Sequence, residues 1–268
     1  MGYSLQSNKK SKEGEGHIDR DKQFEYINKK AKSFQSAGNP VISVDTKKKE
    51  NVGNYKNNGK EYQLKGKPTE VSVHDFMDKN KGKVAPYGIY DIALNEGWVS
   101  VGVTHDTAEF AVNSIRSWWH EMGEQKYLKS TEIFINADGG GSNSYRARLW
   151  KIELQKLADE LDKSIHVSHF PPGTSKWNKI EHKMFCFISA NWKARPLIDR
   201  ATVVNLIANT KTKSGLTIKA KLDENIYQKG IKIPDDALKS INIQSDQFHG
   251  EWNYIIHPVG NVLNQMNP

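Results

Sequence analysis

Apolar residues recur along the chain at two spacings, which predict an alternation of strands and helices. Short apolar or β-branched runs, typical of buried strands, occupy residues 41–45, 87–93, 98–103, 133–138 and 165–170. Stripes with helical spacing predict helices at about 19–34, 107–122, 144–161, 179–192 and 199–209. Asp106 or Thr107 can cap the second of these helices, and Gly97 lies in the turn of a hairpin between the second and third strands.

Hairpin strands come first in this order and helix-linked strands come afterwards, which is the order of an α/β layer fold with a mixed sheet. We therefore predict an RNase H-like mixed β-sheet flanked by helices over residues 38–196. Residues 1–37 are expected to hold a flexible segment, at 1–17, and the leading helix. Residues 197–268 are predicted to form a basic C-terminal extension that packs on this domain. Its expected elements are two strands and a short helix, at 216–221, 252–256 and 234–240.

Residues 51–86 form a long excursion rich in lysine and glycine, with one short strand candidate at 70–74. Loops of this length are usually functional or disordered. We interpret the excursion as a substrate-facing insertion in the domain, with a solvated surface loop as a nearly equal alternative.

The charge balance indicates what kind of partner the chain takes. The 268 residues carry a formal net charge of +8, and lysines and arginines near phosphates gain affinity by releasing counterions. The sequence has no apolar run long enough to span a membrane and no secretory signal, so we expect no membrane partner. The single cysteine, Cys186, excludes an intrachain disulfide and fits a reducing, cytoplasmic compartment. Its apolar helical surroundings favour a packed thiol over a nucleophile.

Three acidic residues stand at positions that this topology can bring together. Asp45 ends the first strand, Asp138 ends the fourth, and Glu181 lies in the opening turn of the helix at 179–192. If the first and fourth strands are neighbours, Asp45 and Asp138 project from the same edge of the sheet, where α/β folds bind their ligands. Glu181 can then reach across from the packed helix. The alternative is that Asp45 and Glu181 are ordinary caps or solvated ends.

Three carboxylates without soft ligands make a hard oxygen site, which suits Mg²⁺ or Mn²⁺. Two such ions about 4 Å apart can activate a water or a 3′-hydroxyl and stabilise the leaving oxygen at a phosphate. The spacing of the acids is therefore compatible with phosphoryl transfer.

Four segments together resemble the signature blocks of the DDE-type insertion-sequence transposases of the Rhodopirellula type; they are residues 44–50, 136–143, 169–182 and 250–254. Asn178-Lys179-Ile180-Glu181 is also similar to the third-carboxylate motif of the wider Tc1/mariner-like group. The resemblance runs from about residue 2 to residue 256. It implies an RNase H-like catalytic domain that cuts transposon ends and joins them to target DNA.

The resemblance also implies the cofactor and the setting. Two ions of Mg²⁺ or Mn²⁺ would be held by Asp45, Asp138 and Glu181. The partners would be the transposon ends and the target DNA, with a homodimer on DNA left open. The expected location is the bacterial cytoplasm, in association with the nucleoid.

Members of this family carry a helix-turn-helix region before the catalytic domain. Residues 2–6 resemble the end of that region, so we expect a chain that starts inside or just after it. A truncated copy, a catalytic-domain fragment and half of a split reading frame all fit this expectation.

We expect DNA contacts from residues beside the acids: Lys47, Lys48, Lys49, Gly139, Gly140, Arg146, Trp177 and His182. The lysines and the arginine would contact phosphates, and the glycines would let a backbone pass close. The tryptophan would stack on a base. The histidine, like His169, would position a water or donate to the scissile phosphate. The alternatives are a solvated lysine run, a plain turn and structural histidines.

Three other functions stay open on the sequence. An RNase H-like nuclease would cleave DNA without strand transfer. An inactive transposase remnant would bind DNA without needing metal at the carboxylates. A basic protein whose partner is RNA or an acidic protein would bind without any dependence on the three acids.

Overall fold

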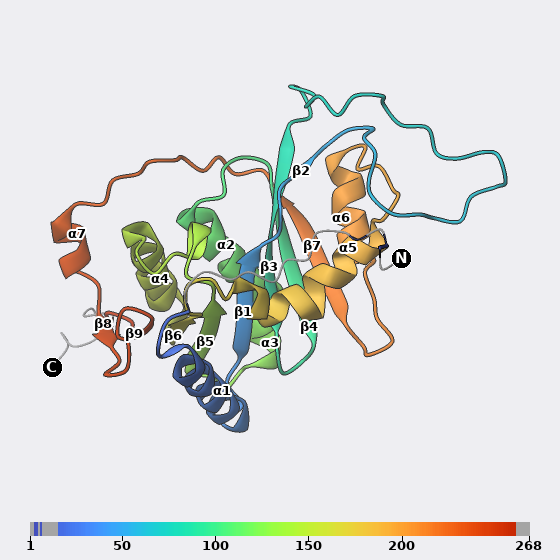
Figure 1. The fold of residues 1–268 in the computed structure, drawn as a ribbon. Coiled ribbons are helices and arrows are strands. Elements are labelled where there is room, and N and C mark those ends of the chain that lie inside the picture. Colours follow the sequence, from blue (N-terminus) through green and yellow to red (C-terminus); the bar gives the residue numbers. More distant parts are fainter. Residues whose placement is uncertain (1–2, 5, 7–15, 261–268) are drawn as a thin grey trace, which may run out of the picture.

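The computed structural model describes residues 3–4, 6 and 16–260. Within this part of the chain, nine strands form one mixed sheet with helices on both faces (Figure 1). The strands are β1 Val41–Thr46, β2 Glu50–Asn51, β3 Lys83–Asp91, β4 Glu96–Gly102, β5 Glu132–Ala137, β6 Ser164–His169, β7 Thr217–Asp223, β8 Ile243–Ser245 and β9 Asn253–Ile256. The α-helices are α1 Arg20–Ser36, α2 Ala108–Trp118, α3 Glu124–Lys126, α4 Arg148–Leu161, α5 Cys186–Asn191, α6 Arg200–Ala208 and α7 Asp235–Lys239. The 3-10 and π turns are η1 Trp119–Gly123, η2 Gly141–Asn143, η3 Ser175–Trp177 and η4 Glu181–Phe185.

The middle of the sheet confirms the predicted RNase H-like arrangement. Strand β3 runs antiparallel to both of its neighbours, β4 and β1, and β5 and β6 then continue parallel to β1. Val44 of β1 lies opposite Ala137 of β5, which in turn lies opposite His169 of β6. The carboxyl ends of these three parallel strands therefore meet at one edge of the sheet.

Residues after 197 supply strands to both sides of this central sheet. β7 pairs in parallel with β4, and β9 pairs antiparallel with β6 and carries β8 beyond it. The outer strands of the path β7-β4-β3-β1-β5-β6-β9-β8 thus come from the last part of the chain (Figure 1).

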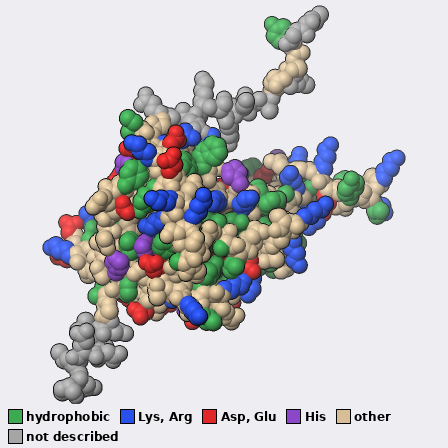
Figure 2. Space-filling model, turned by 90° about the horizontal axis from the view of Figure 1, so that it is seen from below, with side chains coloured by type: hydrophobic (Ala, Val, Ile, Leu, Met, Phe, Trp, Pro, Cys, Tyr) green, Lys and Arg blue, Asp and Glu red, His purple; other side chains and the backbone are tan. Residues whose placement is uncertain are grey.

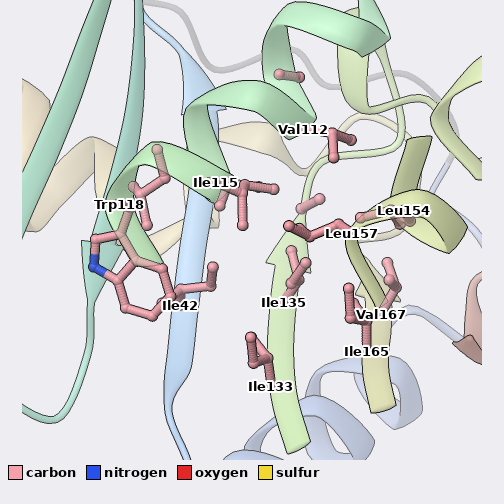
Figure 3. Close-up of a cluster of buried hydrophobic side chains, with 14 of the residues drawn as sticks. Ile42, Val112, Ile115, Trp118, Ile133, Ile135, Leu154, Leu157, Ile165 and Val167 are labelled. Atoms are coloured by element: carbon pink, nitrogen blue, oxygen red, sulfur yellow. The ribbon is translucent and has the colours of Figure 1, made fainter. Parts of the chain in front are cut away.

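Both faces of the sheet are buried, which explains why the central strands are apolar at nearly every position. On one face α2 and α4 pack through Ile115, Trp118 and Leu157 against Ile42 and Ile135 (Figure 3). The opposite face is covered partly by α1 and partly by η4, α5 and α6. Complete burial of each such side chain contributes about 1.5–3 kcal/mol, so these two apolar layers dominate the stability of the fold.

Several element predictions need correction. The strand expected at 70–74 does not form; these residues pair with no strand, and Val73 is exposed. High β-propensity is insufficient there, because a strand also needs a partner strand and this segment pairs with none. The helix expected from 144 starts only at Arg148, after the turn η2. Strand β8 was not predicted, since its three residues are exposed and carry no alternation.

The thiol of Cys186 is exposed, so the predicted packed thiol is wrong. The core positions of this helix are instead Met184, Phe185 and Ile188. The Cys186 Sγ donates a hydrogen bond to the His182 carbonyl at 3.0 Å. The prediction assumed regular α-helical spacing. The π turn η4 interrupts that spacing, so a different set of positions faces the sheet.

Two further expectations concern the ends and the membrane. The flexible segment predicted at 1–17 and the resemblance of residues 2–6 to a preceding region fall mostly outside the described residues.

In the described part, no helix combines the length and the apolarity needed to cross a membrane.

Two glycines let the η4–α5 segment approach β3 and β4 closely. A Cβ on Gly88 would lie 2.5 Å from a ring carbon of Phe185 and 2.7 Å from the methyl carbon of Met184. A Cβ on Gly97 would lie 2.3 Å from the Met184 sulfur. Gly88 is the register partner of Asp45, so this contact also sets how near η4 comes to the end of β1.

We predict that Gly88→Ala lowers the free energy of unfolding by about 1–3 kcal/mol, because the packed Phe185 and Met184 must move. For a chain of this size the loss corresponds to a fall in Tm of several degrees, measured by thermal denaturation. Gly260→Ala is the matched control, since Gly260 has no atom within 4 Å of the added carbon. Equal Tm values for the two variants would contradict the close packing.

Candidate active site

The ends of β1 and β5 bring Asp45 and Asp138 together. Each acid lies one position beyond the register pair Val44–Ala137, and both line a pocket of about 280 Å³. Burial and, next, the charge of Asp138 raise the pKa of Asp45 to about 8. The Thr46 N–H, which donates to Asp45 Oδ1 at 2.7 Å, lowers that pKa in part. The two carboxyl groups therefore share one poorly solvated space.

The third acid, Glu181, is positioned by a buried polar contact between its own segment and β1. The Ser43 hydroxyl donates to Asn178 Oδ1 and accepts from the Ile180 N–H at 3.0 Å. Asn178 Nδ2 donates to the Val44 carbonyl at 3.0 Å. Ser43 and Asn178 are fully buried, so these hydrogen bonds fix the segment to the strand that carries Asp45.

Glu181 interacts electrostatically with the other two acids. Its charge raises the pKa of both Asp45 and Asp138. Burial raises the pKa of Glu181 itself, and the Lys47 ammonium opposes that change. The structure thus places Asp45 and Asp138 in one pocket, and Glu181 outside its lining but within electrostatic range of both.

Asp138 is oriented from two sides. Asn143 Nδ2 donates to its Oδ1 at 3.3 Å, and the buried Tyr87 hydroxyl fixes that amide by donating to Asn143 Oδ1 at 2.7 Å. The Gly140 backbone N–H also bonds the carboxylate. Burial still raises the pKa of Asp138, while these two hydrogen bonds lower it.

A buried chain of hydrogen bonds supports Asp138 from behind. His169 Nδ1 lies 2.9 Å from the Asp138 carbonyl oxygen, and its Nε2 lies 3.0 Å from the Tyr254 hydroxyl. Burial lowers the pKa of His169 to about 4, so the ring is neutral at pH 7. The carbonyl can only accept, which assigns the ring proton to Nδ1. Tyr254 then donates to Nε2 and accepts from Trp150 Nε1 at 2.9 Å.

A fourth acid, Asp106, lines the same pocket. Its Oδ1 accepts from the Thr46 hydroxyl at 3.2 Å, and its charge raises the pKa of Asp45 and of Asp138. From its position before a helical stripe, Asp106 was expected only to cap a helix. Thr107 takes that role, since its side chain accepts from the Phe110 N–H, so the Asp106 carboxylate is left to face the pocket.

Lys47 is the cation buried beside these acids. Its ammonium lies 4.4 Å from the ring centre of Trp192 and 3.9 Å from Glu50, and burial lowers its pKa. In the described residues, one buried ammonium thus faces several clustered carboxylates. The donor set is entirely oxygen and short of positive charge, which fits a hard divalent cation held by Asp45, Asp138 and Glu181.

The other residues singled out for nucleic acid lie around this pocket. Lys48 and Lys49 are exposed, and Lys49 Nζ lies 3.8 Å from Asp106. Gly139 is partly buried and Gly140 exposed, directly after Asp138. Arg146 is exposed just after η2, and Trp177 is half exposed in η3. His182 is exposed, and its Nε2 contacts the Lys176 carbonyl oxygen.

Three adjoining pockets make one groove across the acids. The acidic pocket shares Lys48 and Lys49 with a pocket lined by the excursion, which adds Lys56 and Lys83. On its other side it shares Asp138 and Gly140 with a pocket bounded by Arg146 and the turn at 171–173. Basic residues thus flank the carboxylates on both sides. Figure 2 shows further Lys and Arg side chains on the part of the molecule that projects to the right.

Structural similarity was found to the Mos1 transposase. Its paired-end complex with the left transposon end has a TM-score of 0.47 and 12% identity, covering 76% of this chain and 57% of that one. The Mos1 mariner paired end complex with Mn gives the same values. The complex with Mg gives a TM-score of 0.32 and 12% identity, over 59% and 45% of the two chains. This chain thus spans little more than half the length of the Mos1 chains.

Sequence comparison gives two results. No curated protein matches the chain. The family described as Rhodopirellula transposase DDE domain matches it over residues 1–258, nearly its full length. That span includes all the acids of the pocket and the segments that position them. The chain therefore belongs to the Rhodopirellula transposase DDE domain family.

Proposed function

We propose that this chain performs metal-dependent DNA strand cleavage and strand transfer. The observation that carries the proposal is the meeting of Asp45 and Asp138 in a groove flanked by lysines and an arginine, with Glu181 near enough for its charge to raise the pKa of both. A phosphodiester backbone bound by the basic flanks would cross the carboxylates. Family membership supports the same function. The substrates would be transposon ends and target DNA, bound by a homodimer in the bacterial cytoplasm at the nucleoid.

The proposed roles follow from the placement of each group. Asp45, Asp138 and Glu181 would hold two Mg²⁺ or Mn²⁺ ions. When bound, such ions activate a water or 3′-hydroxyl and stabilise the leaving oxygen. Residues 38–196 would form the core of the catalytic domain, and strands from the part of 197–268 that the structure describes would complete its sheet. Lys48, Lys49 and Arg146 would hold phosphates along the groove.

Lys47 and His169 are buried, so we propose roles for them other than the DNA contacts that the sequence suggested. Lys47 is buried against Trp192, so we propose that it balances the charge of Glu181 beside the phosphate path. His169 is buried and bonded at both ring nitrogens, so we propose that it positions the Asp138 backbone and does not touch DNA. Trp177 keeps its proposed role of stacking on a base, as half of its surface is exposed.

Strand transfer is tested with a labelled DNA carrying a free 3′-hydroxyl, supercoiled plasmid and Mn²⁺. We expect nicked plasmid and label joined to plasmid. Asp138→Asn and Glu181→Gln should each reduce both products at least about 100-fold, because loss of a metal ligand removes several kcal/mol of transition-state stabilisation. The control Asp236→Asn changes an exposed acid of α7 and should have no effect.

The pattern of products separates the possibilities. Nicking without joining would identify a nuclease. Nicking that survives in both Asp138→Asn and Glu181→Gln would refute the proposed site. DNA binding without either product, and without metal binding, would identify an inactive remnant.

The raised pKa of Asp45 predicts how stability changes with pH. Its carboxyl titrates near 3.8 in the unfolded chain and at about 8 in the folded chain. Between these values the folded chain retains a proton that the unfolded chain has lost, so the metal-free protein loses stability as pH rises toward 8. We expect its Tm to fall over this range, and to fall less in Asp45→Asn.

The same protonation controls metal binding, because a ligand must be deprotonated to bind. Mn²⁺ should therefore raise the Tm of the parent chain more at pH 8 than at pH 6, and should raise that of Asp45→Asn little at either pH. If the Tm of the metal-free parent chain falls no more steeply with rising pH than the Tm of Asp45→Asn, the burial of Asp45 is contradicted.

We further propose that Asp106 adds negative charge to the metal site as a fourth carboxylate. Asp106→Asn preserves the acceptor for the Thr46 hydroxyl but removes the charge. It should weaken Mn²⁺ binding roughly 10-fold, as is usual for groups just outside the ligands, measured by calorimetric titration. Glu109→Gln, on the adjoining α2 turn, is the control. An unchanged Mn²⁺ affinity in Asp106→Asn would limit Asp106 to orienting Thr46.

A further inference from the structure

A second group of metal-ligating side chains lies away from the groove, where the segment before α1 meets the turn between β8 and β9. His17, Asp19 and His249 each offer one ligand atom, and these atoms all lie within 4.8 Å of one another. None of the three lines any of the pockets that form the groove. The donors are two imidazoles and one carboxylate, unlike the all-oxygen set of the groove.

The hydrogen bonds of these three side chains indicate which of their atoms can bind a ligand. His249 Nδ1 lies 3.0 Å from Glu251 Oε1, and its Nε2 lies 3.1 Å from Asp19 Oδ2. The other oxygen of Asp19, Oδ1, is bonded to Lys22 at 3.0 Å. His17 Nδ1 accepts from the Asp19 backbone N–H at 3.1 Å, which leaves its Nε2 for a ligand.

The two rings are also held by packing. Trp252 stacks on His249 with ring centres 4.3 Å apart, and meets the His17 ring edge-on at 4.7 Å. His249 has a φ of +51°, in the left-handed region that non-glycine residues rarely occupy. The N–H groups of Trp252 and Asn253 both donate to its carbonyl at 2.8 Å, so the turn maintains this conformation.

We propose that His17 Nε2, Asp19 Oδ2 and His249 Nε2 bind a Zn²⁺ ion. Imidazole nitrogen and carboxylate oxygen are usual zinc ligands, and metal-bound histidines usually give their second ring nitrogen to a carboxylate, as His249 does to Glu251. Zinc bonds of about 2.0 Å in a tetrahedron place ligands about 3.3 Å apart, close to the His249–Asp19 distance of 3.1 Å. A water would complete the tetrahedron. Binding releases the proton that Nε2 now shares with Asp19.

The site would tie together two parts of the chain that are far apart in sequence, since His249 and Asp19 are 230 positions apart. Asp19 directly precedes α1, and Gln23 in the first turns of that helix donates to the His169 carbonyl at 2.9 Å. The ion would therefore clamp the start of α1 against the β8–β9 turn, beside the residue that supports Asp138.

The test is calorimetric titration of the full chain with Zn²⁺ in excess Mg²⁺, which would occupy the carboxylates of the groove under the proposed function. We expect one tight Zn²⁺ site in the parent chain. His17→Gln and His249→Gln should weaken it more than 100-fold. Glu251→Gln should weaken it by roughly 10- to 100-fold, the usual effect of an outer partner. Zn²⁺ should also raise the Tm of the parent chain but not that of His17→Gln.

Two controls make the result specific. His120 also contacts two carboxylates, Glu124 and Glu160, but has no second histidine beside it, so His120→Gln should bind Zn²⁺ normally. Asp138→Asn should bind Zn²⁺ normally as well, even if it abolishes activity. His17 is exposed, so its variant should fold even if His249→Gln does not. Equal Zn²⁺ affinity in the parent chain and His17→Gln, or no tight site in the parent chain, would overturn the proposal and leave an ion-pair cluster.

Discussion

The parallel pairing of β1 with β5 is the constraint on which the rest of the site depends. It places Asp45 and Asp138 side by side at the end of a sheet whose two faces are covered by helices. Because water is largely excluded, each carboxylate raises the cost of ionising the other. The fold therefore tolerates unfavourable electrostatics at this edge, and it does so most easily when a cation compensates the charge.

The rest of the site follows from how other segments reach that edge. The glycines of β3 and β4 admit the η4 turn, and the contact between Ser43 and Asn178 fixes its register. Asn143 and His169 hold Asp138 by its carboxylate and its backbone respectively. The supporting groups are buried, and most of them are polar and fully hydrogen-bonded, which is how a preorganised site avoids loss of stability.

Much of the fold was predictable because its central strands and helices have strong periodicity. The acids at the ends of strands were also visible, since strand ends follow from the same pattern. Asp106 was missed because an acid before a helix has the same local pattern whether it caps that helix or faces a pocket. Nothing local distinguishes Lys47 from Lys48, although only Lys47 lies under Trp192. The 70–74 segment has strand-like residues but pairs with no strand, which only the tertiary structure reveals.

The origin of the outer strands has a consequence for how the chain is made. β7 and β9, which cover β4 and β6, are synthesised last. Until these strands are made, β4 and β6 have unpaired backbone N–H and C=O groups along their outer edges. Unpaired edges of this kind promote association between chains. The sheet is complete only when residues 217–256 have joined it. Folding of the whole sheet thus depends on strands that follow every acid of the groove in the sequence.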